Sequence, residues 1–349
     1  MKRLTDYLAG FYSPAEYPVL AVQLKSWSAE KPLAGVKILD GTPVFRNTMV
    51  KYMVLLAGGA DLTVSVGKDI PCDPEIVAIA PEFGIRIADE KILTETFDAV
   101  ADCAGRHKNV RSRYGYAELT RSGLEYYRDC REPVFSVDSG ILKRFETTLG
   151  TGESFVRAMK HLGYGNFNGK TIVVFGGGKV GRGCAFYAAA NGAETFIIDR
   201  QDIVPPEKVS FVNSADCDQT NELLRKAWCV VSATGIAGTL KEYVPILRTS
   251  DCLIANMGVE DEFGSALPDD RVLNRKKPLN FLLDEPTALR CIDPSMALSN
   301  AALLLLVRKM IAPGINLPPE DLELAMISDI RKNGMMNDEI NMILKECNL

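Results

Sequence analysis

Histidine is scarce in this chain, because only His107 and His161 carry an imidazole among 349 residues. Histidine is the side chain whose ordinary pKa lies nearest to neutrality, so this scarcity restricts mechanisms that move several protons through imidazoles. The nine cysteines occur singly, without a CxxC pair or the spacing of metal ligands. They indicate buried thiols in a reducing compartment, and we expect neither a disulfide framework nor a metal site.

Basic charge and long apolar runs are missing as well. The formal net charge is -5, and no cluster of lysine and arginine with interleaved aromatics is present, so we expect no nucleic-acid partner. The start of the chain lacks the apolar run of a signal peptide, and the most apolar segment, AALLLL, is followed directly by VRKM. We therefore expect no membrane association and a cytoplasmic protein.

What is present is the pattern of an α/β protein of two domains. The chain is 47% hydrophobic and 24% charged, as is typical of a globular protein. Residues 36–41 and 61–66 resemble strands, residues 48–60 resemble a helix, and the apolar run FDAVAD ends in Asp102. A second series of strands, each ending in small or polar residues, follows in KTIVVFGGG, ETFIIDR, WCVVSATG and DCLIANMG.

The stretch FGGGKVGRG provides the strongest chemical signal. Gly176, Gly178 and Gly181 form GxGxxG between an apolar strand and a helix of small residues, and Asp199 ends the next strand. Such glycines let the backbone approach a pyrophosphate, and such a carboxylate accepts hydrogen bonds from ribose hydroxyls. Asp199 would repel a 2′-phosphate, which favours NAD over NADP, and Arg200 beside it weakens this preference slightly. Two alternatives stay open: an S-adenosyl ligand on the same carboxylate, or no nucleotide.

Longer stretches resemble a known family. GKTIVVFGGGKVGRGCA, preceded by GTGESFVRAM and followed by VVSATGIAG and IANMGVEDEFG, resembles the cofactor domain of S-adenosylhomocysteine hydrolases, in which NAD is tightly bound. PLAGVKILDGTPVF and LLAGGADLTVS resemble the first strands of that family's substrate domain, and IDPSMALSNAALL resembles the segment that returns to it. The resemblance covers residues 32–305. It implies a NAD cofactor, a small-molecule substrate and a homo-oligomer, either a dimer or a tetramer.

The resemblance also implies a division into two Rossmann-like domains with doubly wound parallel sheets. We predict a discontinuous substrate domain, whose first part is residues 1–149 and whose returning segment is residues 293–325. A NAD-binding domain of residues 150–292 lies between these segments, and residues 326–349 form a helical C-terminal tail. The cleft between the two domains is the expected site.

The departures from the family concern its catalytic histidines, which help to move a proton beside a transient ketone and to expel a thiol. Pro43, Val259 and Asp293 stand at the corresponding positions. Proline and valine move no protons, and a carboxylate lacks the pKa of an imidazole. Because each such group contributes roughly 10²–10⁴-fold to a rate, we do not expect hydrolysis of S-adenosylhomocysteine.

The family's catalytic lysine has one candidate here. Counting forward from Pro133 places Lys143 at its position, whereas counting backward from Glu153 places Leu142 there. A lysine partly desolvated beside a nicotinamide would have a lowered pKa and serve as a base. The alternative is a surface lysine in KRFE. We predict Lys143 as the base, with Asp102 or Asp293 orienting the substrate hydroxyl.

The remaining candidates follow from the same resemblance. The predicted cofactor contacts are Gly176, Gly178, Lys179, Val180, Gly181, Asp199, Arg200, Thr120, Ser122, Thr147, Thr234, Gly235, Asn256 and Gly258. The predicted substrate contacts are Arg46, Glu118, Asp138 and Glu146. An anion-binding Arg46 would indicate a carboxylate or phosphate substrate. The alternatives are a surface arginine for Arg46, a helix cap for Asp138 and a solvated face for Glu146.

These residues favour one function over two alternatives. We expect bound NAD to oxidise a hydroxyl of a small polar substrate, either as a net dehydrogenation or as an oxidation–reduction cycle. The first alternative is a regulatory protein that retains NAD but has lost catalysis. The second is methyl transfer from S-adenosylmethionine in the same Rossmann fold.

Overall fold

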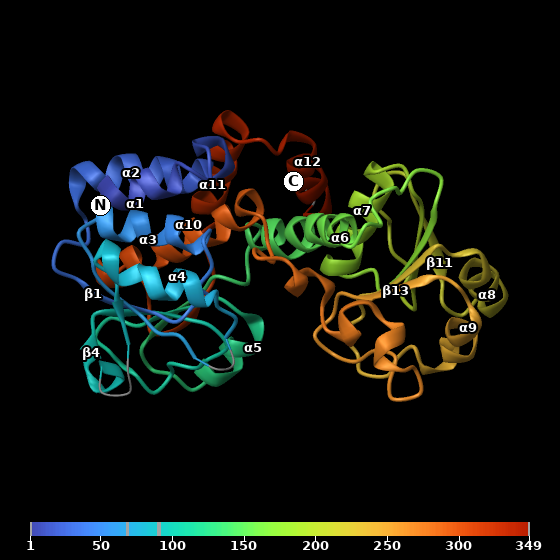
Figure 1. Ribbon diagram of the computed structural model, residues 1–349. Helices are drawn as coiled ribbons and strands as arrows, with labels where there is room; N and C mark the ends of the chain where they lie inside the picture. Colours follow the sequence, from blue (N-terminus) through green and yellow to red (C-terminus); the bar gives the residue numbers. More distant parts are fainter. Residues whose placement is uncertain (1, 68–69, 89–91, 348–349) are drawn as a thin grey trace. The chain divides into compact units, whose positions relative to one another are not determined.

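The chain folds into two compact units. The computed structural model describes residues 2–67, 70–88 and 92–347 (Figure 1). Unit 1 comprises Met1–Phe145 and Leu289–Leu349, and unit 2 comprises Glu146–Ala288. Both boundaries lie a few residues before the predicted ones. Residues 326–349, which we predicted as a separate tail, contain helices that belong to unit 1.

Unit 1 is built on a seven-stranded sheet in the order β14-β8-β7-β5-β1-β2-β3, in which every pair of neighbours is parallel. The strands are β1 (Lys37–Asp40), β2 (Asp61–Val64), β3 (Arg86–Ile87), β5 (Ala99–Asp102), β7 (Tyr116–Glu118), β8 (Pro133–Ser136) and β14 (Gly314–Asn316). The strand order reverses between β1 and β5. Ligands of open α/β sheets bind at such a switch point, outside the carboxyl ends of the strands.

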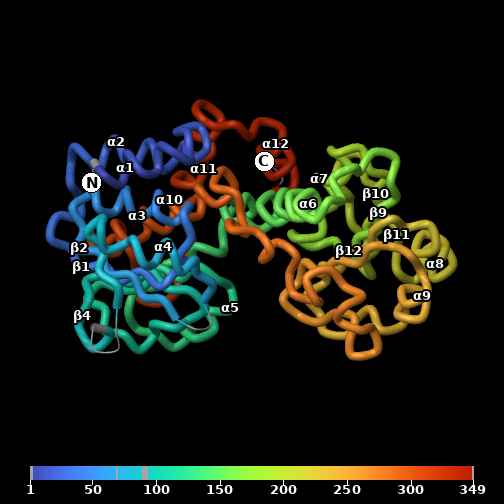
Figure 2. Tube along the Cα trace, in the orientation of Figure 1, coloured from blue at the N-terminus to red at the C-terminus, as the bar shows by residue number. Residues whose placement is uncertain are grey.

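Helices of unit 1 pack together and onto this sheet (Figure 2). They are α1 (Lys2–Leu8), α2 (Pro18–Glu30), α3 (Thr48–Ala57), α4 (Pro74–Ile79), α5 (Arg121–Leu124), α10 (Leu289–Val307), α11 (Glu320–Asn333) and α12 (Asn337–Glu346). A small parallel pair, β4 (Thr96–Phe97) and β6 (Arg111–Ser112), completes the unit.

Helix α10 is an exception to our expectation that no segment approaches a membrane span. Among the described helices, it alone is long and apolar enough to cross a membrane by length and composition. However, 72% of its most apolar window is buried inside the protein, where α10 packs on α2, α3 and β5. A core helix of a soluble protein passes the same test, so this is weak evidence for a span.

Unit 2 is built on a five-stranded parallel sheet in the order β11-β10-β9-β12-β13. Its strands are β9 (Thr171–Phe175), β10 (Glu194–Asp199), β11 (Val209–Asn213), β12 (Cys229–Ser232) and β13 (Leu253–Asn256), and its helices are α6 (Thr151–His161), α7 (Lys179–Ala190), α8 (Cys217–Lys226) and α9 (Val244–Thr249). The order reverses between β9 and β12. These two sheets confirm the predicted α/β fold with two Rossmann-like domains, one of them discontinuous.

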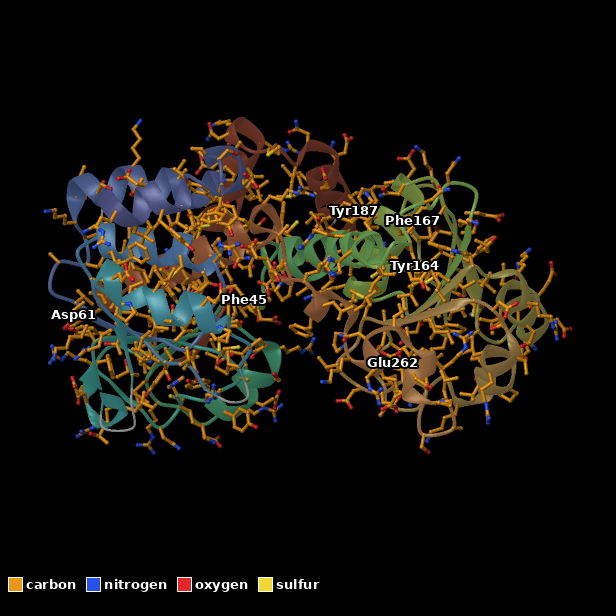
Figure 3. The ribbon with its side chains drawn as sticks, in the orientation of Figure 1. Phe45, Asp61, Tyr164, Phe167, Tyr187 and Glu262 are labelled. Atoms are coloured by element: carbon orange, nitrogen blue, oxygen red, sulfur yellow. The ribbon has the colours of Figure 1, made fainter. Side chains whose placement is uncertain are left out.

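The core of unit 2 explains its sequence pattern. The strands are apolar on both faces because helices cover both faces of a parallel sheet. On one face, the ring of Phe167, which is labelled in Figure 3, packs edge-on against the rings of Phe155 and Trp228. Helices α6 and α7 approach so closely that a Cβ atom at Gly152 would overlap the backbone of Gly183. The small residues of the predicted helix therefore serve close packing.

Candidate functional site

The glycine loop of unit 2 has the geometry that its motif predicts. Strand β9 ends at Phe175, Gly176 has a φ of 101°, and α7 begins after Gly178. A Cβ atom at Gly181 would overlap the carbonyl oxygen of Gly176, so only glycine fits there. A Cβ atom at Gly178 would meet no atom within 4 Å. The first turn of α7, with Lys179 and Val180, therefore opens beside free space suited to an anion.

Asp199 stands beside this loop, at the end of β10. Its carboxylate accepts hydrogen bonds from the backbone N–H of Gly177 at 2.6 Å and of Gln201 at 2.9 Å. Arg200 follows it on the surface. The carboxylate is thus fixed against the glycine loop, as the motif requires of a ribose acceptor.

Two buried side chains organise the loops that follow β12 and β13. Glu262 accepts hydrogen bonds from the backbone of Thr234 at 3.0 Å and of Gly235 at 2.7 Å, and from the Thr234 hydroxyl at 2.7 Å (Figure 3). The Asn256 side chain accepts hydrogen bonds from the Ser232 hydroxyl and from the backbone N–H of Gly258. We missed Glu262 because it lies inside the acidic run VEDE, which resembles a solvated turn.

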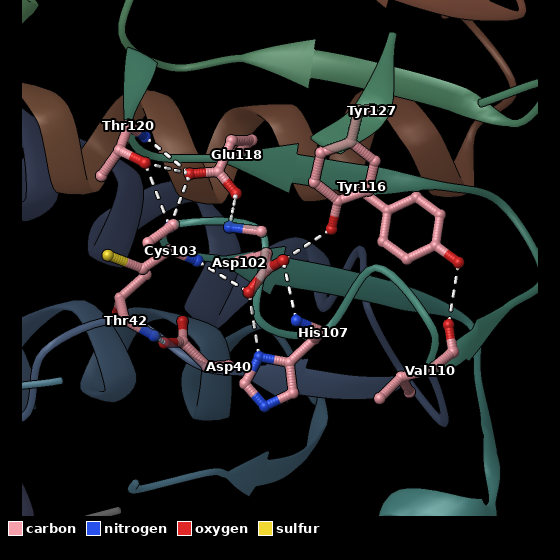
Figure 4. A network of polar contacts seen from close by, with 12 residues as sticks. Asp40, Thr42, Asp102, Cys103, His107, Val110, Tyr116, Glu118, Thr120 and Tyr127 are labelled. Atoms are coloured by element: carbon pink, nitrogen blue, oxygen red, sulfur yellow. Dashed lines mark hydrogen bonds and ion pairs between the residues drawn. The ribbon is translucent and has the colours of Figure 1, made fainter. Parts of the chain in front are cut away.

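The carboxyl edge of the unit 1 sheet carries a row of polar side chains. Asp40, Asp102, Glu118 and Ser136 end the strands β1, β5, β7 and β8. Asp102 lies opposite Glu118, and Glu118 lies opposite Ser136 in the strand register. Figure 4 shows the first three of these residues together. The row spans the switch point between β1 and β5, where a ligand is expected.

Asp102 is fully buried, and its contacts are internal. Its carboxylate accepts hydrogen bonds from the backbone N–H of Cys103 at 2.8 Å and of His107 at 3.0 Å, and from the Tyr127 hydroxyl at 2.6 Å. It also lies 2.9 Å from Nδ1 of His107 (Figure 4). Burial, together with the charge of Asp102, raises the pKa of Tyr127 far above its ordinary value. Asp102 therefore orients His107, where we predicted that it orients a substrate hydroxyl.

Glu118 is also satisfied internally. It accepts hydrogen bonds from the backbone N–H of Ala104 at 3.0 Å and of Gly105 at 3.2 Å, and from the Thr120 hydroxyl at 2.6 Å. Burial raises the pKa of Glu118. Thr120 in turn caps α5, on which Ser122 is exposed. In the structure, Glu118 and Thr120 hold the loop after β5, although we predicted them as substrate and cofactor contacts.

A buried ion pair that we did not predict joins Lys51 of α3 to Asp40. Their side chains are 1% and 0% exposed. Asp40 also accepts hydrogen bonds from the backbone N–H of Thr42 at 3.0 Å and from its hydroxyl. The sequence contains an indication of this ion pair, because Lys51 stands inside the apolar helix sequence TMVKYMVLLA. A lysine so placed needs a buried acidic partner.

Lys143 and its neighbours lie around the end of unit 1 and the start of unit 2. Lys143 is only 3% exposed, so the alternative of a surface lysine is wrong. Asp138 follows β8, and Glu146 and Thr147 lie in the π-helix Phe145–Gly150, all three partly buried. In another part of unit 1, the guanidinium of Arg46 packs over the ring of Phe11 at 4.4 Å.

Asp293 joins helix α10 to the start of helix α2. It is fully buried in α10, and its two oxygens accept hydrogen bonds from the backbone N–H groups of Val19 and Leu20, each at 3.0 Å. These amides belong to the first turn of α2 and have no partner within their own helix. Burial raises the pKa of Asp293 to about 7. Asp293 therefore caps α2, and we give it no catalytic role, in contrast to our prediction.

Comparisons with known proteins identify distant relatives. No protein-family model matches the chain. The adenosylhomocysteinase of Thermoplasma acidophilum is 24% identical over 271 residues, covering 69% of this chain and 66% of that protein. The adenosylhomocysteinase of Aeropyrum pernix is 28% identical over 211 residues, covering 52% and 51%. The chain therefore spans less than two thirds of the length of each of these relatives.

A solved structure shares the fold. The crystal structure of a dipicolinate synthase from Bacillus halodurans superimposes with a TM-score of 0.50 and 12% sequence identity, over 78% of this chain and 98% of that chain. At this identity the likeness concerns the fold alone. The sequence matches, in contrast, confirm the predicted resemblance: the chain is a divergent, adenosylhomocysteinase-like α/β protein.

Proposed function

We propose that the protein binds NAD on unit 2 and uses it to oxidise a hydroxyl group of a small polar substrate. The observation that carries this proposal is the open glycine loop at the β9–β12 switch point, with the Asp199 carboxylate fixed beside it. The similarity to adenosylhomocysteinases supports it. The reaction is either a net dehydrogenation or an oxidation–reduction cycle.

The residues of unit 2 fit this cofactor. The backbone of Gly176 and Gly178, with the first turn of α7, would hold the pyrophosphate, and Asp199 would hold the adenine ribose. The loops that Glu262 and Asn256 organise would hold the nicotinamide end. When bound, NAD supplies a hydride acceptor.

Hydrolysis of S-adenosylhomocysteine is not part of the proposal. Pro43 and Val259 carry no proton-transferring group, and Asp293 caps a helix. Lys143 remains our proposed base, because its side chain is buried beside the start of unit 2 in the chain and a neutral lysine amine can accept a proton.

The first experiment identifies the nucleotide. Denaturing the purified protein should release NAD⁺, NADH or both. Gly178→Ala should abolish this content without unfolding the protein, because the added methyl group meets no protein atom but lies where the pyrophosphate must approach. Release of an S-adenosyl compound would instead favour methyl transfer. A protein that neither contains nor takes up NAD would overturn the proposal.

A second experiment tests the base. Lys143→Ala should abolish reduction of bound NAD⁺ by substrate while leaving the nucleotide content unchanged. Thermal unfolding of the variant distinguishes this result from a folding defect, since Lys143 is buried. Full activity in a folded variant would remove Lys143 from the mechanism.

A regulatory protein that retains NAD but does not react is the second candidate. It is favoured by one observation, namely that Asp102, Glu118 and Asp293 are all engaged by internal hydrogen bonds. The redox state of the released nucleotide separates the candidates. A mixture of NAD⁺ and NADH indicates turnover, whereas NAD⁺ alone that small alcohols do not reduce indicates regulation.

A further inference from the structure

The loop that follows β5 lays two basic side chains across the switch point of unit 1. A Cβ atom at Gly41, directly after β1, would overlap the imidazole of His107, and a Cβ atom at Gly67, beyond β2, would overlap the guanidinium of Arg106. Each side chain therefore occupies space that a glycine leaves open. Both lie at the carboxyl edge of the sheet, where α/β proteins bind ligands.

Asp102 fixes the orientation and the tautomer of His107. It binds both the backbone N–H and Nδ1 of His107, so the proton of a neutral ring is expected on Nδ1 (Figure 4). The other ring nitrogen, Nε2, points away from Asp102 and has no hydrogen-bond partner among the described residues. A neutral His107 thus presents a lone pair that accepts a proton or a hydroxyl hydrogen bond.

Arg106 differs from the neighbouring charged groups in its pairing with the described residues. Its Nη1 is buried without a hydrogen bond, and no described carboxylate pairs with the guanidinium. Asp40 is already paired with Lys51, and Asp102 with His107. A buried polar group without a partner is costly, and guanidinium binds the two oxygens of a carboxylate in parallel. The expected partner is therefore a ligand oxyanion.

We propose that Arg106 and His107 form a binding site for a small hydroxy acid. The carboxylate of the ligand pairs with Arg106, and its hydroxyl donates to Nε2 of His107. The inference concerns ligand binding to unit 1 alone and does not rest on the proposed oxidation, whose proposed base is Lys143. In this proposal, Arg106 binds the anion, whereas the sequence led us to predict Arg46 for that role. Asp102 becomes a positioning residue that acts through His107.

Nitrogen NMR of the histidine rings provides the test, because the chain has only two histidines and His161 is exposed at the end of α6 as an internal reference. Glycolate and lactate at millimolar concentrations should shift the His107 signals and leave those of His161 unchanged. Acetate, which lacks the hydroxyl, and inorganic phosphate should bind at least about tenfold more weakly. Asp102→Asn should alter the tautomer signature of His107 before any ligand is added.

Matched variants identify the anion partner. Arg106→Gln should weaken hydroxy-acid binding at least about tenfold, whereas Arg121→Gln, which alters an exposed arginine of α5, should not. Gly67→Ala, which displaces the guanidinium of Arg106, should weaken binding in the same direction. An unshifted His107, equal binding of phosphate and acetate, or full binding by Arg106→Gln would each overturn the inference. These measurements do not require a bound nucleotide. A failure of this inference can therefore be told apart from a failure of the proposed function, which is tested by the release of NAD.

Discussion

The two units share a parallel sheet with a reversal of strand order, but they place different chemistry at that reversal. In unit 2 the strand before the switch point leads into glycines and the backbone amides of α7. In unit 1 the strands end in charged side chains. Among the described residues, the buried acidic, lysine and histidine side chains of unit 2 are Glu262 and Lys276, whereas those of unit 1 are Asp40, Lys51, Asp102, His107, Glu118, Lys143, Asp293 and Glu323.

In open α/β sheets, the switch point is where ligands bind, and the residues that follow each strand differ in the ligand chemistry that they suit. Backbone amides bind a phosphate without burying a charged side chain. Charged side chains provide more selective recognition, but each must find a partner once it is buried. We therefore expect the stability of unit 1 to depend on the pairing of its buried charges. We expect nucleotide binding by unit 2 to depend on the absence of side chains in its glycine loop.

The largest effect is expected from Gly176→Val in unit 2. The residue has a φ of 101°, and a Cβ atom would lie 2.5 Å from the carbonyl oxygen of Ala233. We expect a loss in the free energy of unfolding of at least about 5 kcal/mol and no bound nucleotide. Gly163→Val, with a φ of 87° but open space, should lose only about 1–3 kcal/mol. Denaturant unfolding and nucleotide release measure both; equal losses would contradict the steric argument.

Lys51→Met tests the dependence of unit 1 on charge. The variant leaves Asp40 buried without its cation, which should lower the free energy of unfolding by about 3–5 kcal/mol. Adding Asp40→Asn should recover much of this loss, because no unpaired charge remains. Denaturant unfolding of the single and double variants provides the measurement. Stability equal to that of the parent in Lys51→Met would show that the pair is not needed.

Asp199→Ala tests the only carboxylate assigned to the cofactor in unit 2. Losing charge-assisted hydrogen bonds of about 1.5–3 kcal/mol should weaken NAD binding roughly 10–150-fold and reduce the preference over NADP. Asp202→Ala, which removes a nearby surface carboxylate bonded to Asn213, is the matched control. Calorimetric titration with both nucleotides measures the effect. Similar affinities for NAD in the two variants would remove Asp199 from the site.

Asp293→Asn should change the pH dependence of stability. The folded pKa of about 7 exceeds the ordinary value of 3.8, so between these values the folded state retains a proton that the unfolded state has lost. Stability is thus present in full below pH 4 and falls as the pH rises toward 7, by up to about 1.4 kcal/mol per unit. The variant, which cannot ionise, should lack this slope in urea unfolding at pH 4–8. The same dependence of stability on pH in the variant and in the parent would contradict the raised pKa of Asp293.

The fold and the geometry of the glycine loop were predictable because their signals are local. Apolar runs that end in small or polar residues are typical of parallel strands, and the glycines with Asp199 act within a single β-α-β segment. The burial of Lys143 and the roles of Asp102 and Asp293 were not predictable in this way. Asp293 accepts a hydrogen bond from the backbone N–H of Val19, 274 residues earlier in the chain, and no local pattern reports such a contact.

The sequence by itself determined the α/β class and the resemblance to adenosylhomocysteinases, and it provides only two histidines. Only the tertiary structure decided that Lys51 neutralises Asp40, that Asp102 orients His107 and that Nη1 of Arg106 is buried without a hydrogen bond to the described residues. The physical reason is that the cost of a buried charge depends on what surrounds it. A residue's type and spacing specify its strand or helix, whereas its partners are set by the packing of distant segments.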